Sequence, residues 1–216
     1  MSFIAVIDYG MGNLRSVSQA VQHVSNDDTT IMITADQSVI QEADRIVFPG
    51  QGAARDCMRA LKKHNLVDVV LDAANTKPFL GICMGMQVLM DHSEENGGVD
   101  CLGKYAGNVR YFSKTATPTA SNERIKIPQM GWNQIYHKTD HPLWAGIPNN
   151  ARFYFVHSYY VTPDDDRITT GETEHGLRYT SALAQDNVFA IQAHPEKSAD
   201  DGLRLLKNFT RWNGSD

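Results

Sequence analysis

The chain has 216 residues, of which 42% are hydrophobic, and its 20 basic and 25 acidic side chains give a net charge of −5 with neutral histidines. This length and composition are enough to bury one large core, so we expect a single domain over residues 1–216. A mildly acidic chain without a Lys/Arg-rich run has no general attraction for nucleic acid, so no nucleic-acid partner is expected.

The three cysteines, Cys57, Cys83 and Cys101, are an odd number and lack the spacing of metal ligands. They argue against a disulfide framework and fit a reducing compartment. The first residues, Met1–Ile7, lack the basic leader of a signal peptide, and no apolar stretch reaches membrane-spanning length. We therefore expect a soluble cytoplasmic protein without a metal site or a membrane contact.

In the first half of the chain, short apolar runs alternate with helical patterns. Strands are predicted at Phe3–Ile7, Ile31–Ile33, Ile46–Phe48 and Pro78–Ile82. Helices are indicated by apolar residues at helical spacing, namely Val17, Ala20, Val21 and Val24, then Met58 and Leu61, then Leu66, Val70 and Ala73. This alternation is typical of a parallel sheet covered by helices.

The second half is richer in extended runs, which Gly, Asn and Asp separate as in hairpins. These runs are Asn108–Phe112, Asn133–Tyr136, Arg152–Val161, Ser181–Ala184 and Val188–Gln192. The Ser/Thr/Pro-rich segment Ser113–Asn122 is expected to be a mobile loop. The predicted fold class is α/β, with an open, mostly parallel, flavodoxin-like central sheet flanked by helices and extra antiparallel strands in the second half.

A last helix is predicted over Ala199–Trp212. Its apolar stripe is formed by Leu203, Leu206, Phe209 and Trp212. The basic side chains expected to face water are those of Arg204, Lys207 and Arg211.

Cys83 lies in a Gly-Ile-Cys-Met-Gly segment that directly follows the apolar run Pro78–Leu80. Glycines on both sides of a residue allow a sharp turn at the end of a buried strand. A helix predicted over Met84–His92 would point its N-terminal amides at the sulfur and favour the thiolate. Cys83 is therefore a candidate nucleophile, and a buried, inert cysteine is the alternative.

His194 and Glu196 close the apolar run Val188–Ile191 and are separated by Pro195. In an extended segment, side chains two apart share a face, and proline stiffens their presentation. A thiol nucleophile needs a base, and the base needs a partner that fixes its tautomer. His194 and Glu196 fit these two roles, whereas a solvated surface histidine on a turn is the alternative.

Two glycine-rich loops follow predicted strands. Tyr9–Asn13 has the position of a dinucleotide-binding loop, but Arg15 stands where the third glycine belongs, which favours a tight turn over a nucleotide site. In Pro49–Gly52, two glycines around Gln51 allow its N–H to point at a developing oxyanion, with the Met84 amide as second donor. An ordinary turn is the alternative for this second loop.

Six segments spread along nearly the whole chain form a recognisable set. They are IDYGMGNLRSV (Ile7–Val17), PGQGA (Pro49–Ala53), GICMGMQ (Gly81–Gln87), MGWN (Met130–Asn133), YFVHSYY (Tyr154–Tyr160) and HPEKS (His194–Ser198). With these segments the chain resembles class I, triad-type glutamine amidotransferases. Within that family it is most similar to the glutaminase subunits of imidazole glycerol phosphate synthases.

The resemblance implies that Cys83 attacks the side-chain amide of glutamine, that His194 protonates the departing ammonia and that Glu196 orients His194. No cofactor is implied. The oxyanion hole would be formed by Gly50, Gln51 and Met84. The residues implied to bind the substrate are Gly52, Gln87, Ser158 and Tyr159.

In this family, ammonia passes to a (β/α)₈ cyclase subunit of the synthase, which would be the partner in a heterodimer. The resemblance places four residues at the interface or the ammonia gate, namely Met130, Trp132, Tyr154 and Lys197. Core packing is the alternative role of Met130 and Trp132, and an ordinary surface charge that of Lys197. The resemblance also implies a low glutaminase rate for the isolated chain, since two orientations of the Pro49–Gly52 peptides would allow activation by the partner.

Two departures and three rival functions accompany the resemblance. The polar loop Ser113–Asn122 is longer than is usual in the family. Ala193 stands where family members commonly carry Phe before the catalytic histidine. Rivals with the same triad are amidotransferase subunits that serve surface-sugar synthesis or pyridoxal phosphate synthesis. A DJ-1-like redox or chaperone protein is a rival without amide hydrolysis, and the His194 and Glu196 pair speaks against it.

Overall fold

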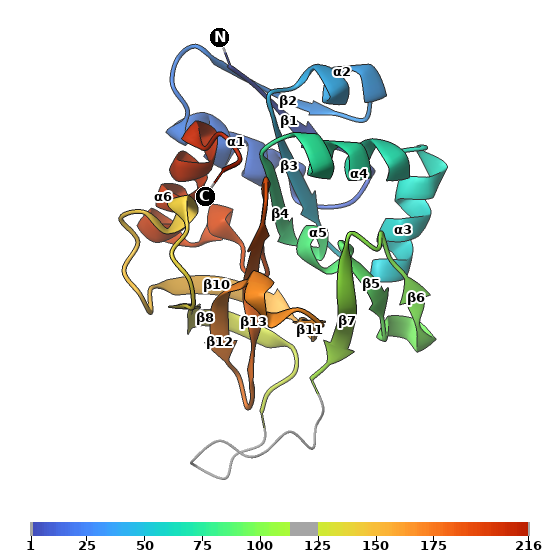
Figure 1. Ribbon diagram of the computed structural model, residues 1–216, viewed down its shortest axis with the longest axis vertical. Helices are drawn as coiled ribbons and strands as arrows, with labels where there is room; N and C mark the ends of the chain where they lie inside the picture. The colour runs from blue at the N-terminus through green and yellow to red at the C-terminus, as the bar shows by residue number, and fades with distance from the viewer. Residues whose placement is uncertain (1, 113–124, 216) are drawn as a thin grey trace.

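The parallel half of the central sheet brings two distant parts of the chain together. A computed structural model describes residues 2–112 and 125–215, and there five parallel strands lie in the order β2-β1-β3-β4-β14 (Figure 1). Their bounds are β1 (Ser2–Ile7), β2 (Thr29–Thr34), β3 (Arg45–Gly50), β4 (Phe79–Cys83) and β14 (Val188–Ile191). The carboxyl ends of β4 and β14 are therefore adjacent, where parallel α/β sheets place ligands.

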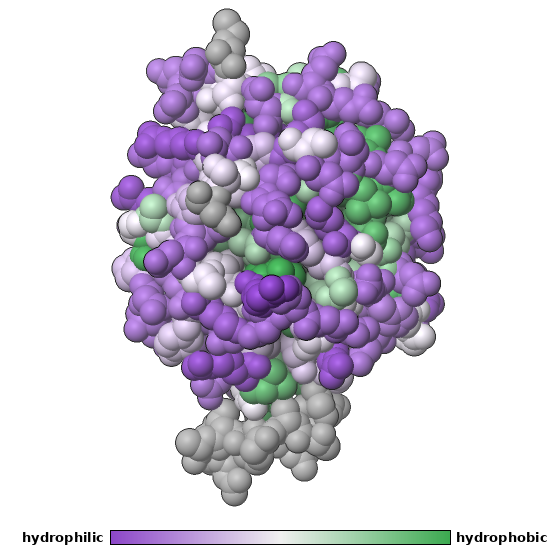
Figure 2. All heavy atoms as spheres, viewed as in Figure 1, coloured by the Kyte–Doolittle hydropathy of each residue, from purple (hydrophilic) through white to green (hydrophobic). Residues whose placement is uncertain are grey.

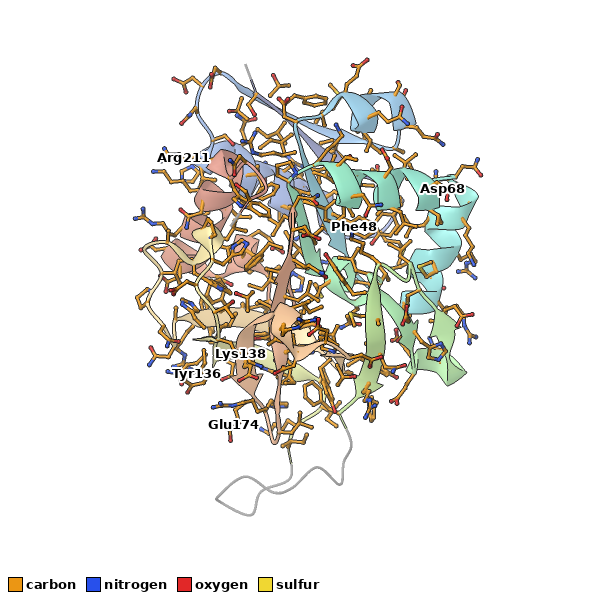
Figure 3. All side chains as sticks on the ribbon, viewed as in Figure 1. Phe48, Asp68, Tyr136, Lys138, Glu174 and Arg211 are labelled. Atoms are coloured by element: carbon orange, nitrogen blue, oxygen red, sulfur yellow. The ribbon has the colours of Figure 1, made fainter. Side chains whose placement is uncertain are left out.

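Helices cover both faces of this parallel half, as predicted. One face carries α1 (Leu14–Val24) and α6 (Ala199–Arg211), and the other carries α2 (Gln37–Glu42), α3 (Ala54–Lys63) and α4 (Val67–Thr76) (Figure 1). Each face buries its own apolar cluster against the sheet. Phe48 of β3 lies near the centre of the molecule, whereas Asp68 and Arg211 lie on opposite sides (Figure 3).

The second half adds antiparallel strands, again as predicted. From β14 the sheet continues through β13 (Arg178–Gln185), β11 (Tyr159–Pro163), β7 (Tyr105–Tyr111), β5 (Met90–Ser93) and β6 (Val99–Asp100). Two strands branch from this path, β12 (Thr169–Glu174) and β9 (Tyr136–His137). A separate ribbon pairs β8 (Gln129–Gln134) with β10 (Arg152–His157). Among the described strands of this part, β5 and β7 are the pair that runs in parallel.

Short 3-10 helices complete the description of the elements. They are η1 (Glu95–Gly97), η2 (Pro142–Trp144), η3 (Asp166–Ile168) and η4 (Pro195–Lys197).

The face shown in Figure 2 is mostly hydrophilic. Within residues 2–112 and 125–215, no helix is long and apolar enough to cross a membrane.

The predicted helix Met84–His92 is wrong in its length. The helix after Cys83, α5 (Met84–Gln87), has four residues, and strand β5 begins at Met90. Pairing of β5 with β7 and burial of Met90 and Ser93 favour the extended conformation over the helix that the local pattern indicated.

Three further predictions need correction, one about a strand and two about side chains of the last helix. The run Arg152–Val161 is two strands in different sheets, β10 and β11, separated at Ser158. Of the predicted apolar stripe of the last helix, Leu206, Phe209 and Trp212 are buried, as predicted, whereas Leu203 is only partly buried. The structure adds Gly202 and Leu205 to the buried positions of α6. Of the basic side chains, Arg204 and Arg211 are exposed and Lys207 is partly buried. The predicted loop Ser113–Asn122 lies outside the described residues.

Candidate active site

Cys83 ends β4 on a turn that only glycine neighbours permit. Its backbone has φ 55° and ψ −111°, a conformation that non-glycine residues rarely adopt. A Cβ on Gly85 would lie 1.9 Å from the carbonyl oxygen of Phe48, and one on Gly81 would lie 2.9 Å from the Cβ of Ala190. The glycines of the motif thus let β3 and β14 approach the turn closely, as the pattern predicted.

The short helix α5 changes the expected electrostatics at Cys83. A helix of four residues has little of the dipole that a longer helix would direct at the sulfur. Stabilisation of a thiolate must therefore come chiefly from side chains around Cys83. Two of these, His194 and Gln192, come from the end of β14.

His194 and Glu196 form a buried pair beside Cys83. Nδ1 of His194 lies 2.9 Å from Oε1 of Glu196, and their side chains are 3% and 1% exposed. Because a carboxylate oxygen accepts, Nδ1 carries the proton and Nε2 is the atom available for chemistry. Within residues 2–112 and 125–215, Nε2 has no hydrogen-bond partner. The His194 ring is thereby fixed in the orientation that a general base requires.

The pKa of His194 reflects three opposing influences. Burial lowers it, but the adjacent Cys83 and Glu196 raise it more, to about 10. The charged imidazolium is therefore favoured when a thiolate and a carboxylate flank the ring.

The backbone around His194 is also fixed. Its N–H donates to the carbonyl of Tyr154 at 2.9 Å. Ser198 Oγ donates to the His194 carbonyl at 2.6 Å and accepts from the Tyr154 N–H at 3.0 Å. Ala193 is fully buried in the apolar cluster that includes α6.

A pocket of about 440 Å³ opens above Cys83 and His194. Predicted site residues supply eight of its lining positions, namely Gln51, Gly52, Cys83, Met84, Gln87, Ser158, Tyr159 and His194. The remaining lining residues, Glu95, Pro128, Val156 and His157, were not predicted. The structure therefore brings predicted site residues from four separate segments, 51–52, 83–87, 158–159 and 194, to one cavity. Gly50 and Glu196 are not among the described residues that line it, and Glu196 reaches the site through its contact with His194.

The predicted oxyanion loop Pro49–Gly52 is held by Tyr9 and Cys57. Tyr9 Oη donates to the Pro49 carbonyl at 3.0 Å, and Cys57 Sγ donates to the Gln51 carbonyl at 3.4 Å. Gly50 pairs in register with Cys83 and leaves no room for a Cβ, which would lie 2.4 Å from Tyr9 Oη. Gly52 has φ +86°, a backbone conformation that glycine adopts more readily than other residues.

The loop after β1 contains the tight turn that its glycines predicted. Gly10 and Gly12 have φ of +83° and +110°, and a Cβ on Gly12 would lie 3.6 Å from Gly50 Cα. The two glycine-rich loops thus pack against each other. This packing and the Tyr9 hydrogen bond support the oxyanion loop from behind.

Gln87 and Glu95 supply acceptors to the pocket. Gln87 Nε2 donates to the Tyr159 carbonyl at 3.1 Å and to Gln192 Oε1 at 2.8 Å, while its own Oε1 is buried without a partner among the described residues. Glu95 Oε2 accepts from the Ala54 N–H at 2.7 Å, and burial raises the pKa of this carboxyl. Glu95 lies in a polar turn without any sequence pattern, which is why sequence reasoning missed it.

A second histidine in the pocket, His157, is not a candidate base. Its Nδ1 lies 2.7 Å from the Tyr159 carbonyl and its Nε2 lies 3.2 Å from Tyr179 Oη. Burial lowers the pKa of His157 to about 3. It is therefore a neutral structural histidine, with both ring nitrogens engaged.

The four predicted interface residues form one surface cluster. Met130 and Trp132 on β8 are 66% and 47% exposed, and Trp132 packs edge-on against Tyr154 of β10 with ring centroids 6.2 Å apart. Lys197 Nζ lies 5.9 Å from the centroid of the Tyr154 ring. We call Met130, Trp132, Tyr154 and Lys197 the β8–β10 patch. Core packing of Met130 and Trp132 is excluded by their exposure.

Comparisons with known proteins agree with this arrangement. The family "Glutamine amidotransferase class-I" matches residues 5–212. The subunit HisH of imidazole glycerol phosphate synthase from Hydrogenovibrio crunogenus is 57% identical over 98% of this chain and 97% of the relative. The same subunit from Dechloromonas aromatica is 55% identical over 97% of this chain and 96% of the relative.

Solved structures with low sequence identity share the fold. PurLQS from Thermotoga maritima has a TM-score of 0.71 at 15% identity, with 97% of this chain and 98% of the other chain covered. The glutaminase domain of Trypanosoma brucei CTPS with bound acivicin has a TM-score of 0.64 at 17% identity, with 100% and 95% covered. They confirm the predicted fold class. The family match and the HisH relatives show that the chain belongs to the class-I glutamine amidotransferase family.

Proposed function

We propose that the chain is a single-domain, cytoplasmic glutaminase subunit of imidazole glycerol phosphate synthase. It hydrolyses glutamine through a Cys83 thioester and delivers the ammonia to a cyclase subunit in histidine biosynthesis. The observation that carries the proposal is the convergence of Cys83, His194 and Glu196 at one pocket. Relatives named as this subunit, 57% and 55% identical over nearly the whole chain, favour this function over the rival amidotransferases.

The reaction begins with a thiolate of Cys83 and an imidazolium of His194. Sγ forms a bond to the amide carbon of glutamine, and the carbonyl electron pair moves to oxygen. N–H groups of the oxyanion loop and of Met84 stabilise that oxygen. The C–N bond then breaks while His194 Nε2 gives its proton to the nitrogen, which leaves as ammonia.

The resulting glutamyl thioester is hydrolysed by the same residues. Neutral His194 takes a proton from water, and the hydroxide oxygen bonds to the thioester carbon. The C–S bond breaks, glutamate leaves and Cys83 returns as the thiolate beside the imidazolium. Glu196 keeps Nε2 directed at the reacting atoms in both steps, through its bond to Nδ1.

The amino-acid end of glutamine is placed by acceptors and backbone groups on the other side of the pocket. An α-ammonium group requires acceptors, which Gln87 Oε1 and the Glu95 carboxylate provide. The backbone at Ser158 and Tyr159 faces the same cavity and would hold the carboxylate, with Gly52 lining the wall. These contacts would set the distance between Cys83 and the side-chain amide.

The β8–β10 patch is the proposed docking surface for the cyclase. Large exposed apolar side chains that lie together are typical of an interaction surface. Two patch residues bond directly to the backbone of the catalytic histidine: the Tyr154 carbonyl accepts from the His194 N–H at 2.9 Å, and the Lys197 N–H donates to the His194 carbonyl at 3.0 Å. Docking would also shield ammonia from bulk water, where protonation destroys its nucleophilicity.

The test compares the purified chain with its complex. We expect little glutamate from the chain alone and a large increase with the cyclase and its nucleotide, because partner binding would complete the oxyanion hole. Cys83→Ala should abolish glutamine use by the complex and leave synthesis from added ammonia intact. Cys101→Ser is the matched control, because Cys101 lies outside the pocket lining, and it should keep both activities. Glutamine-dependent synthesis by Cys83→Ala would overturn the proposal.

A further inference from the structure

Gln192 is a fully buried polar side chain two residues before the catalytic histidine. It follows β14 and lies beside apolar residues of the cluster that includes α6. Burial of a primary amide costs free energy unless its groups are hydrogen-bonded. The partners of Gln192 therefore indicate why an amide is present at this position.

The orientation of the Gln192 amide follows from a backbone carbonyl. The Tyr159 carbonyl can only accept, so the group of Gln87 that lies 3.1 Å from it must be the Nε2 donor. The same Nε2 lies 2.8 Å from Gln192, so the Gln192 atom facing it must be the acceptor Oε1. The remaining end of the amide, Nε2, lies 3.7 Å from Cys83 Sγ and donates to it.

A donor directed at the sulfur favours one protonation state of Cys83. Sulfur accepts a hydrogen bond more strongly as a thiolate than as a thiol, because the bond is then charge-assisted. The four-residue helix α5 supplies little dipole at this point, so a side-chain donor has greater weight. His194 lies at the same sulfur and supplies a positive charge.

We propose that Gln192 is a further catalytic residue, whose Nε2–H donates to Cys83 Sγ and stabilises the thiolate that attacks glutamine. Gln87 is the positioning residue for this contact. Its Nε2 fixes the Gln192 amide while its Oε1 remains available to the substrate ammonium. The proposal deepens the glutaminase function proposed above and rests on it. No proton leaves Gln192 at any step.

Alkylation of Cys83 by iodoacetamide tests the contact without glutamine. The rate of modification, followed on the Cys83 peptide by mass spectrometry, rises with pH as the thiolate forms. Titratable groups that act on or lie near the sulfur come from several elements, namely His194 and Glu196 at η4, Tyr9 after β1, Cys57 of α3 and Glu95 of η1. All of them are retained in the variants below, so a change in the midpoint reports on Gln192.

Two substitutions remove the donor in different ways. Gln192→Met removes the amide, and Gln192→Glu keeps an acceptor for Gln87 but turns an oxygen toward the sulfur. We expect the pH midpoint of alkylation to rise by about one unit in Gln192→Met and by more in Gln192→Glu. A hydrogen bond to a charged group is strong enough to lower a pKa by about one unit, so its loss should raise the midpoint by that amount. Gln185→Glu is the matched control, because Gln185 is exposed at the far end of the β13–β14 pair, and its midpoint should not move.

The outcomes separate this inference from the proposed function. An unchanged midpoint in folded Gln192→Met and Gln192→Glu would overturn the role of Gln192, even in an active glutaminase. A raised midpoint supports the contact, and a lack of glutamine hydrolysis by the unsubstituted complex would then count against the proposed function alone. Should both variants fail to fold, the side-chain amide resonance of Gln192 in the unsubstituted chain decides. It should move with pH as Cys83 titrates and stay constant in Cys83→Ala, and a constant resonance in both proteins would overturn the role.

Discussion

Nδ1 of His194 lies 2.9 Å from Oε1 of Glu196, in a pair that is almost completely excluded from solvent. This contact and Cys83 together raise the pKa of His194 against the effect of burial, to about 10. Because folding raises this pKa, the charged imidazolium stabilises the folded chain fully at pH values below about 6.5, the pKa of histidine in the unfolded chain. This stabilisation is lost as the pH rises through about 10. The same proton is the one that the departing ammonia requires.

Glu196→Gln should therefore move the alkaline limit of glutaminase activity to lower pH. Loss of the carboxylate lowers the pKa of His194, so the imidazolium disappears earlier on the alkaline side. We also expect kcat to fall by about 10²-fold or more, because the ring loses its orienting acceptor. The measurement is the pH profile of kcat/KM for the complex with the cyclase. An alkaline limit identical to that of the unsubstituted enzyme would remove Glu196 from this role.

Tyr9→Phe should weaken catalysis without weakening glutamine binding. The substitution removes the donor to the buried Pro49 carbonyl and leaves the oxyanion loop with less support. We expect the free energy of unfolding to fall by about 1–3 kcal/mol and kcat to fall with little change in KM. Denaturant unfolding and steady-state kinetics measure the two effects. A higher KM with constant kcat would indicate that the loop acts in binding instead.

Gly85→Ala should prevent the turn at Cys83 from forming. Its Cβ would lie 1.9 Å from the Phe48 carbonyl oxygen, and a backbone atom of a central strand cannot move aside. We expect a loss of about 3 kcal/mol or more in the free energy of unfolding. Gly97→Ala is the control, because a Cβ on Gly97 would meet no atom within 4 Å. The cost of this substitution comes from the left-handed φ of +82°, which alanine adopts less readily than glycine. That control should lose about 1 kcal/mol. Equal losses in the two variants would contradict the steric account.

Met130→Glu should impair binding of the cyclase and leave the fold intact. Met130 is 66% exposed, so the free energy of unfolding should change by less than about 0.5 kcal/mol. A charge in place of this exposed apolar side chain of the β8–β10 patch should weaken binding by about tenfold or more, measured by calorimetry. Met32→Glu is the matched control, because Met32 is an exposed methionine, 43% accessible, on the edge strand β2. Equal loss of binding in both variants would show that the patch is not specific.

Local patterns were sufficient to predict the sharp turn at Cys83 and the parallel strands. The turn is predicted because an apolar run ends at a cysteine that has a glycine two residues before it and two residues after it. The pairing of His194 with Glu196 is predicted because the two residues are two positions apart in the sequence. Cys83 and His194 meet because β4 and β14 pair in parallel, which periodicity alone does not specify. Their convergence was expected from the chemistry and from the resemblance.

Long-range contacts set the features that sequence reasoning missed. The helix after Cys83 ends at Gln87 because β5 pairs with β7, although the local pattern continues as a helix. Glu95 and Gln192 have no periodic or motif signal of their own. They become functional candidates only through the pocket around Cys83 and the fixed hydrogen bonds of Gln87.

Trapping with a glutamine-mimicking electrophile tests the central claim most directly. Burial raises the pKa of Cys57 to about 12 and that of Cys101 to about 11, so both stay protonated at neutral pH. After incubation of the complex at neutral pH, peptide mass spectrometry should find one adduct, on Cys83, and excess glutamine should prevent it. Modification of Cys57 or Cys101 in place of Cys83, or labelling of Cys83 that glutamine does not slow, would contradict the account.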